Sequence, residues 1–328
     1  MKKLKKGTLF RTIAAAIAAL CPLIATAQSG TAFPHKRVTI IVPFTPGGPT
    51  DIQGRMLAAE LQKRWTQPVT VENKPGSSGM VAGQSVAKSD PDGHTLFFTA
   101  TGFVSTASVF IKNPPFDPVR DFAPITLTSS APFVVTTVTA IPPRNMKDFI
   151  SYAKANPGKL NYATIGGGTM EIDLALFVER LGLDMIKVPF NGSAPIARAL
   201  ATNDVQLYFS GIFSNKALVD AGKVVLLATT GDRRFSLAPD LPTLREQGIN
   251  YTATYAYGFL AQGRTPRAIV DRLNRDIRQV VEIPEMKQKI SESGTEATTS
   301  TPEEMSKMLE DEAQRYRQGA ARAGIQPQ

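Results

Sequence analysis

The chain has 328 residues, with 37 lysine and arginine residues against 28 aspartate and glutamate residues, and a formal net charge of +9. Five of the basic residues lie within the first 11 positions, so the rest of the chain carries +4, which is too small a charge to indicate nucleic-acid binding. The single cysteine excludes a disulfide framework, and the length predicts a large core divided between two domains.

The N-terminus has the pattern of an export signal. Basic residues precede a small, apolar run at 12–24, and Ala25-Thr26-Ala27 follows as an A-x-A cleavage site. We expect a signal peptide over residues 1–27, cleavage after Ala27 and a periplasmic location for the mature chain. Cys21 lies inside this signal, so the mature chain would have no thiol chemistry. No later segment has the unbroken apolar length of a membrane span.

A glycine-rich turn follows the first apolar run. Residues 38–42 predict a buried strand, and the Pro-Gly-Gly-Pro turn at 46–49 leads to a helix, for which Thr50 and Gln53 match a capping box. We expect Gly48 to adopt a left-handed conformation and to let the backbone approach a bound molecule closely. The N–H groups at the helix start would then form an anion site. An ordinary strand-to-helix turn is the alternative.

A second segment repeats this design. Residues 160–165 predict a strand, three glycines and Thr169 follow, and a helix with one apolar face begins. Strand and helix signals alternate along the chain, which favours α/β domains with mostly parallel sheets. The extended stretch 122–138 is long enough to cross between two domains, and residues 257–261 are the expected return crossing.

Residues that could support catalysis are scarce. His35 and His94 are the only histidines, and we expect both at the surface rather than in a catalytic centre. The sequence has no nucleophile elbow, no P-loop, no dinucleotide-binding glycine motif and no cysteine–histidine metal spacing. We interpret Asp51 as a complement to the first helical turn, and the basic C-terminal stretch as a solvated helix face. We predict no catalytic residue, no metal ligand and no cofactor.

Several short motifs together carry a family resemblance. They are Val-Pro-Phe at 42–44 with the glycines at 47–48 and Asp51, Val-Glu-Asn-Lys-Pro-Gly at 71–76 with Gly79, Pro-Asp-Gly at 91–93, Ala-Lys-Ala-Asn-Pro-Gly-Lys-Leu-Asn-Tyr at 153–162, and Pro-Asp-Leu-Pro-Thr at 239–243. With these motifs, the chain from about residue 33 onward resembles the extracytoplasmic solute receptors of tripartite tricarboxylate transporters, the Bug receptors.

The resemblance implies an α/β fold of the periplasmic binding protein type II-like class, with two doubly wound domains and a ligand cleft between them. Residues 28–128 and 259–328 would form a discontinuous first domain, and residues 129–258 the second. Such receptors hold a ligand carboxylate with backbone N–H groups and ordered water. By position, the ligand-binding residues would be Phe44, Thr45, Gly48, Thr50, Asp51, Ser78, Thr99, Thr101, Thr164, Gly166, Gly168, Thr169, Glu171, Phe190 and Asn191.

Two positions depart from the family pattern. Glu171 stands where many relatives have a histidine, and Ala256 where many have a tryptophan, so we expect both to alter the pocket. Glu171 lies in the predicted first turn of a helix, where a carboxylate complements the dipole. The alternative is that Glu171 selects against a second carboxylate on the ligand, because like charges repel in a poorly solvated cleft.

The resemblance implies a monomeric receptor that captures a small organic carboxylate in the periplasm and delivers it to the permease subunits of a tripartite transporter. No nucleic-acid partner is expected. One alternative is a sensor that presents the same ligand to a membrane kinase. Another is an exported α/β hydrolase or lyase in which Asp51, Glu171 or Asp173 transfers protons, although no nucleophile–base pair supports it.

Overall fold

The elements of the fold lie in the second of two units into which the contacts divide the chain, residues 1–35 and residues 36–328. A computed structural model describes residues 33–76, 79–165, 168–190, 192–322, 324–325 and 327. The predicted signal peptide at 1–27 and its Cys21 lie outside these residues, as do three predicted ligand-binding residues, Ser78, Gly166 and Asn191.

The first sheet has six strands in the order β11-β4-β10-β3-β1-β2. Three of them form a parallel group in which β1 pairs with both β2 and β3, while β10 runs antiparallel between β3 and β4. The strands are β1 (Val38–Val42), β2 (Val69–Asn73), β3 (Thr95–Ala100), β4 (Phe122–Pro132), β10 (Thr254–Gln262) and β11 (Glu296–Ala297). The carboxyl ends of the parallel strands therefore meet along one edge, where α/β sheets commonly place ligands.

The second sheet has five strands in the order β7-β6-β8-β5-β9. Strand β6 is parallel to both neighbours, whereas β5 is antiparallel to β8 and β9. The strands are β5 (Val134–Val138), β6 (Leu160–Ile165), β7 (Met185–Phe190), β8 (Leu207–Ser210) and β9 (Val224–Thr229). Both sheets are thus mixed, with parallel pairs where a helix connects successive strands.

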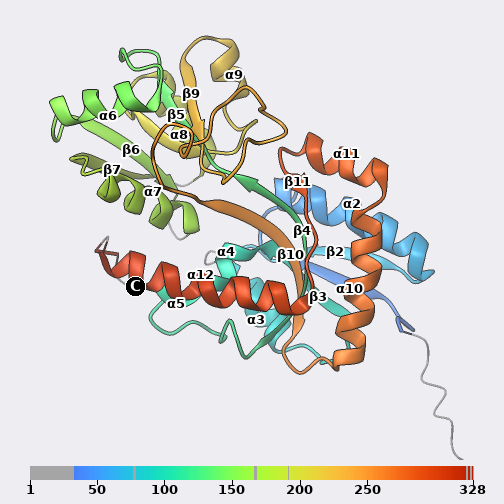
Figure 1. Cartoon of the computed structure of the whole chain (residues 1–328). Helices are drawn as coiled ribbons and strands as arrows, with labels where there is room; N and C mark the ends of the chain where they lie inside the picture. The colour runs from blue at the N-terminus through green and yellow to red at the C-terminus, as the bar shows by residue number, and fades with distance from the viewer. Residues whose placement is uncertain are drawn as a thin grey trace, which may run out of the picture. The chain divides into compact units, whose positions relative to one another are not determined.

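The chain passes between the two sheets twice (Figure 1). On the first passage, β4 ends at Pro132 and β5 begins at Val134, so the extended stretch predicted at 122–138 is two strands joined at Phe133. On the second, residues 230–253 connect β9 to β10. The stretch 257–261, expected as the return crossing, lies inside β10 and within the first sheet. The sheets differ by a few residues from the predicted domain boundaries, and the two-domain division itself stays a prediction.

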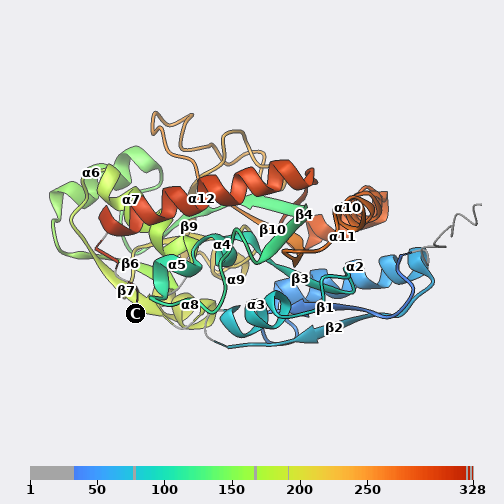
Figure 2. The same ribbon diagram turned by 90° about the horizontal axis from the view of Figure 1, so that it is seen from below.

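Helices cover the faces of both sheets (Figures 1 and 2). The C-terminal helix α12 packs against β4, α4 and α5 of the first sheet's layers and also against α7, which belongs to the second. The helices are α2 (Pro49–Trp65), α3 (Met80–Ala87), α4 (Thr101–Ser105), α5 (Ala107–Phe110), α6 (Met146–Ala155), α7 (Thr169–Arg180), α8 (Ser193–Ala201), α9 (Lys216–Asp220), α10 (Arg267–Val281), α11 (Pro284–Glu292) and α12 (Pro302–Arg322). Helix α12 therefore contacts elements of both sheets.

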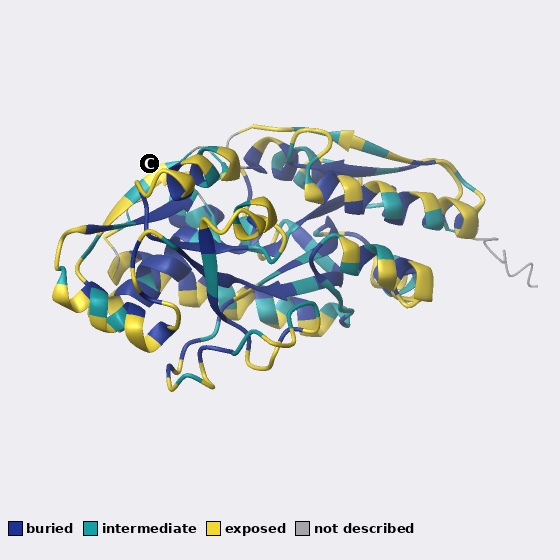
Figure 3. Cartoon of the chain, turned by 90° about the horizontal axis from the view of Figure 1, so that it is seen from above, coloured by how far each residue is buried: buried dark blue, intermediate teal, exposed yellow. Residues whose placement is uncertain are grey.

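Each sheet has its own buried core. Phe149, Phe177 and Phe209 are fully buried in the cluster around the second sheet. Phe97 and Leu260 occupy the corresponding cluster around the first. Figure 3 shows the same division, with buried strands enclosed by helices whose outer faces are exposed. Burial of aromatic and branched side chains stabilises each layer without any disulfide.

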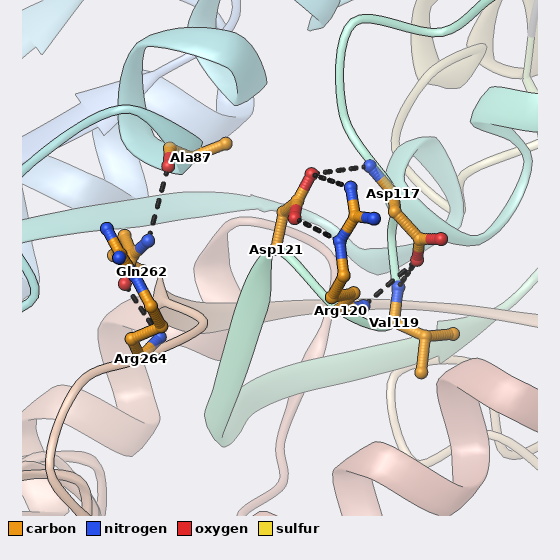
Figure 4. A network of polar contacts seen from close by, with 7 residues as sticks. All are labelled: Ala87, Asp117, Val119, Arg120, Asp121, Gln262 and Arg264. Atoms are coloured by element: carbon orange, nitrogen blue, oxygen red, sulfur yellow. Dashed lines mark hydrogen bonds and ion pairs between the residues drawn. The ribbon is translucent and has the colours of Figure 1, made fainter.

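Polar contacts surround the start of β4 and the end of β10 (Figure 4). Asp121, just before β4, accepts hydrogen bonds from the backbone N–H of Asp117 at 2.8 Å and from Nε of Arg120 at 2.9 Å. At the end of β10, Nε2 of Gln262 donates to the carbonyl oxygen of Ala87 at 3.4 Å, at the C-terminal end of α3. The first two contacts order the loop that precedes β4, and the third joins the end of β10 to α3.

The start of α2 differs from the prediction at two residues. The N-cap is Gly48, and Pro49 occupies the first turn, where its missing N–H costs no hydrogen bond. Thr50 is therefore inside the helix, and the capping box predicted with Gln53 is wrong. Gly48 has an extended backbone, with φ −78°, and the left-handed residue is Gly47, with φ 84°. The turn needs a glycine one position earlier than predicted.

Candidate functional site

A cavity of about 450 Å³ lies among elements of both sheets. From the first sheet's layers it is lined by Phe44, Pro49, Gln53 and residues 100–103. From the second it is lined by residues 168–170, Tyr208, Phe209 and the loop 211–214, with β10, the loop 293–295 and α12 completing the wall. Its volume is in the range of small-molecule sites.

Two long helices begin at this cavity. Pro49 at the start of α2 and Thr169 at the start of α7 both line it, and neither helix has a side-chain N-cap. The first N–H groups of a helix have no intrahelical partner and lie at the positive end of its dipole. This arrangement favours an anionic group in the cavity.

The starts of α4 and α7, which both line the cavity, contact each other directly. A Cβ atom placed on Gly102 would lie 2.3 Å from Cγ2 of Thr169. A side chain at Gly102 would therefore require Thr169, at the start of α7, to shift. The absence of a side chain on α4 therefore permits this close approach of elements from the two sheets.

Aromatic rings form much of the cavity wall. The rings of Phe44 and Phe103 meet edge-on with centroids 4.9 Å apart. On another side, Tyr255 lies 5.1 Å from Phe133 and 6.0 Å from Tyr257. Such edge-to-face and tilted pairs stabilise the wall and offer an apolar surface to the body of a ligand.

The cavity lining also includes Tyr208, Tyr255 and Tyr257, whose hydroxyls stay protonated. Burial raises the pKa of Tyr208 to about 12, and burial also raises the pKa values of Tyr255 and Tyr257. A hydrogen bond with Thr50 lowers the pKa of Tyr257 by a smaller amount. These hydroxyls are therefore neutral near pH 7, and each carries a proton that it can donate in a hydrogen bond.

Charged side chains are nearly absent from the lining. Among the described residues that line the cavity there is no lysine, arginine or histidine, and Glu312 of α12 is the one acidic residue. Glu312 lies in the C-terminal stretch that the sequence predicted to be a solvated face. That prediction is wrong for this side of α12, because Leu309, Ala313 and Tyr316 are buried and Glu312 lines the cavity.

The predicted ligand-binding residues divide into several groups. Four of the described ones line the cavity: Phe44, Thr101, Gly168 and Thr169. Thr101 is buried, and its hydroxyl donates to the carbonyl oxygen of Ala256 at 3.4 Å. Thr45 is exposed, while Thr50 and Thr99 are buried behind the lining. Strand β7 ends at Phe190, which pairs in register with Ile165 of β6.

Asp51 stabilises the loop after β1 through hydrogen bonds. Its carboxylate accepts hydrogen bonds from the backbone N–H of Gly47, from Nε of Arg55 at 3.0 Å and from Nδ2 of Asn73. Asn73 also donates to the carbonyl oxygen of Phe44 at 2.9 Å. The Arg55 contact is the main cause that lowers the pKa of Asp51 to about 2. Asp51 thus holds Phe44 and Gly47 in place from behind the cavity wall.

Glu171 lies in the first turn of α7, as predicted, but does not line the cavity. Its carboxylate forms an ion pair with Nζ of Lys187 on β7 at 3.0 Å. The positive charge of Lys187 opposes any repulsion that Glu171 would exert on a ligand anion. This ion pair weakens the alternative that Glu171 selects against a second ligand carboxylate, and the helix-dipole interpretation stays a prediction.

Thr164 is a predicted ligand-binding residue whose buried hydroxyl has no hydrogen-bond partner among the described residues. Thr164 is fully buried near the end of β6. Buried hydroxyls are normally paired with protein or water. A ligand or an ordered water near the start of α7 would supply that partner.

Sequence reasoning missed several lining residues. Gln53 is buried and connects three elements: its Nε2 donates to Ser293 and Thr295, and its Oε1 accepts from Ser129 at 3.0 Å. Tyr208 and Glu312 lie far from the glycine turns in sequence. Of these lining residues, only Tyr255 and Tyr257 could have been paired from the sequence. They are two positions apart in one strand, so their side chains lie on the same face of the sheet.

Other chemistry finds little support in the described part of the chain. His94 is buried, with Nδ1 3.3 Å from Oδ1 of Asp92, so its predicted surface position is wrong. Within the described residues, no group of three or more histidine, cysteine, aspartate and glutamate side chains could hold a metal ion. No helix in that part of the chain has the length and apolar character needed to span a bilayer.

Comparison with known proteins assigns the chain to a family. The family described as "Tripartite tricarboxylate transporter family receptor" matches residues 54–323. The chain belongs to this family. A UPF0065 protein of Bordetella pertussis is 31% identical over 329 residues, which cover 99% of the receptor described here and 100% of that protein. The predicted family resemblance is confirmed.

Solved structures agree with this assignment. The structure described as R. palustris Rpa4515 with adipate is similar to this receptor with a TM-score of 0.79 and 32% identity, covering 90% of this chain and 100% of that one. The periplasmic binding protein BugD is similar with a TM-score of 0.75 and 30% identity, covering 90% and 100%. The receptor therefore has the α/β fold of periplasmic solute-binding proteins, as predicted.

Proposed function

We propose that this receptor binds a small organic carboxylate in the cavity between its two sheets and delivers it to a membrane permease. The observation that carries the proposal is the pair of uncapped helix starts, α2 and α7, at a cavity whose described lining has no basic side chain. Backbone N–H groups, with ordered water, would hold the carboxylate there. Export through a cleaved signal peptide would place this binding in the periplasm.

The aromatic wall and the tyrosine hydroxyls suit the rest of such a ligand. Apolar rings from Phe44, Phe103 and Phe133 would pack against its carbon skeleton, and the hydroxyls would pair with its polar groups. A similar receptor structure, that of Rpa4515, is described with adipate, which is a carboxylate with an alkyl body. This supports the same ligand class for the present receptor.

The geometry gives no support to the hydrolase or lyase alternative. Asp51 and Glu171 are engaged in ion pairs, and Asp173 is buried between α7 and α12. None of these three carboxylates lines the cavity. A general acid or base has to reach the reacting group within hydrogen-bond distance. We therefore propose that the protein binds its ligand without transforming it.

A thermal-shift screen of the mature chain tests the proposal. The ligands are mono-, di- and tricarboxylates of roughly three to ten carbons, with the matching alcohols and amides as uncharged controls. A ligand at about 100 times its dissociation constant stabilises the folded state by about 2.7 kcal/mol. We expect at least one carboxylate to raise the melting temperature while its amide does not. No shift with any carboxylate would contradict the proposal.

A further inference from the structure

Glu312 lines the cavity, and its carboxyl group has no ion-pair partner within the described residues. Glu312 belongs to helix α12, and the Ser105 hydroxyl of α4 donates a hydrogen bond to its Oε2 at 3.1 Å. No other described residue forms a hydrogen bond or an ion pair with this carboxyl group. A partly buried acidic group with one neutral donor leaves acceptor capacity for a bound molecule.

The groups around Glu312 have mixed charge. On α12 itself, Arg315 stacks over the ring of Tyr316, 4.6 Å from its centroid, and its Nη2 lies 3.5 Å from Oδ1 of Asp173 on α7. Burial is the main cause that raises the pKa of Glu312 to about 7, and the charge of Asp173 adds to it. The Ser105 hydrogen bond and Arg315 oppose this rise. Both protonation states of Glu312 are therefore accessible near neutral pH.

We propose that Glu312 is a specificity-determining residue that meets a second polar group of the ligand inside the cavity. This inference rests on the proposed function, because it presumes that the helix starts hold one ligand carboxylate. An ammonium, hydroxyl or amide group beside Glu312 pairs with the ionised carboxylate. A second carboxylate at the same place enters together with one proton, which Glu312 takes up.

The reason is electrostatic. The described lining has no cation that could separate Glu312 from a second ligand anion, and the tyrosine hydroxyls are neutral. Two carboxylates in a poorly solvated cavity do not both remain ionised, so they share a proton. The sequence pointed to Glu171 for this selection, but the charge of Glu171 faces Lys187. Glu312 is the acidic group that a ligand in the cavity would meet.

Calorimetric titration of the mature chain tests the inference. The probes are matched sets of monocarboxylate, α,ω-dicarboxylate and ω-amino acid, with about four to eight carbons, at pH 7 and pH 9. Over this range Asp173, with a pKa of about 6, stays mostly ionised and contributes little change. We expect the affinity of the dicarboxylate relative to the monocarboxylate to fall by roughly 50-fold from pH 7 to pH 9, because the required proton becomes scarce.

A second readout uses the same titrations in two buffers of different ionisation enthalpy. At pH 9, binding of the dicarboxylate should take up about one proton, and binding of the ω-amino acid about none. In Glu312→Gln the proton uptake and the pH dependence should both disappear, and the ω-amino acid should lose its advantage. Glu310→Gln, an exposed carboxylate on the same helix that pairs with Ser306, is the control and should behave as the unmodified chain does.

The outcomes separate the two proposals. If no carboxylate binds the unmodified chain at either pH, the proposed function fails and this inference fails with it. If carboxylates bind but their relative affinities and proton uptake do not change with pH, only the role of Glu312 is overturned. The unmodified chain alone decides this, so the inference stays testable even if Glu312→Gln does not fold.

Discussion

At the scale of single residues, two buried carboxylates of the receptor have pKa values shifted in opposite directions. Asp51 is held ionised by Arg55, Asn73 and a backbone N–H, and its pKa falls to about 2. Asp173 is enclosed by α7 and α12, and burial raises its pKa to about 6. The sequence shows both as acidic residues near helix starts, and only the packed structure distinguishes them.

Replacement of Asp51 by asparagine should weaken the fold at neutral pH. The folded-state pKa of Asp51 lies below its ordinary value of 3.8, so its stabilisation is present above that value and is lost as the pH falls through 2. Because Arg55 is half-exposed, we discount the effect to about 1–2 kcal/mol at pH 7. Urea unfolding at pH 7 and pH 2 measures it, with the exposed Asp311→Asn as the control. Equal losses at both pH values would show that the charge of Asp51 is not the cause.

At the scale of elements, α7 and α12 form a buried polar contact between the layers of the two sheets. The hydroxyl of Tyr316 donates to Oδ2 of Asp173 at 3.0 Å, and the hydroxyl of Tyr251 donates to its backbone oxygen at 2.6 Å. Arg315 approaches the same carboxylate from the solvent side. This cluster couples the C-terminal helix of the first sheet's layers to the helix that begins at the cavity.

Replacement of Asp173 by asparagine tests this contact. The folded-state pKa of Asp173 is raised above 3.8, so its favourable contribution is present below pH 3.8 and is lost as the pH rises through about 6. The introduced amide stays neutral and still accepts the Tyr316 hydrogen bond. We expect this variant to be more stable than the unmodified chain at pH 8, by on the order of 1–3 kcal/mol, and not at pH 4. The exposed Asp184→Asn is the control, and lower stability of Asp173→Asn at pH 8 would mean that the ion pair with Arg315 outweighs burial.

The elements themselves could largely be predicted from the sequence, because their signals are local. The strands at 38–42 and 160–165, and the helices after them, follow from apolar runs and glycine turns. The cavity could be predicted only in part. Phe44, Gly168 and Thr169 sit at those turns, whereas Tyr208 and Glu312 reach the cavity because β8 and α12 pack there. No local pattern distinguishes Glu312 from the exposed acidic residues of the same helix.

At the scale of the whole receptor, ligand binding should bring the turns at 44–51 and 168–171 together. Gly102 and Thr169 bring helices of the two sheets into close approach beside the cavity, so we expect their contact to take part in closure. In Gly102→Val the Cβ atom alone would lie 2.3 Å from Cγ2 of Thr169, so we expect the branched side chain to hold α4 and α7 apart. We expect small-angle scattering to show a ligand-induced decrease in the radius of gyration for the unmodified chain and a smaller one for Gly102→Val. An unchanged radius of gyration in the saturated, unmodified chain would contradict closure.

The most direct measurement of the central claim is calorimetric titration of the mature chain with the carboxylate that the thermal-shift screen selects, in parallel with Gly168→Leu and Ala217→Leu. Gly168 has an extended backbone, with φ −131°, so leucine fits there without strain and fills the cavity, whereas Ala217 is exposed on α9. We predict one binding site per chain, unchanged affinity in Ala217→Leu, and a loss of roughly tenfold or more in Gly168→Leu. Equal affinity in all three chains would place the ligand outside this cavity and contradict the account.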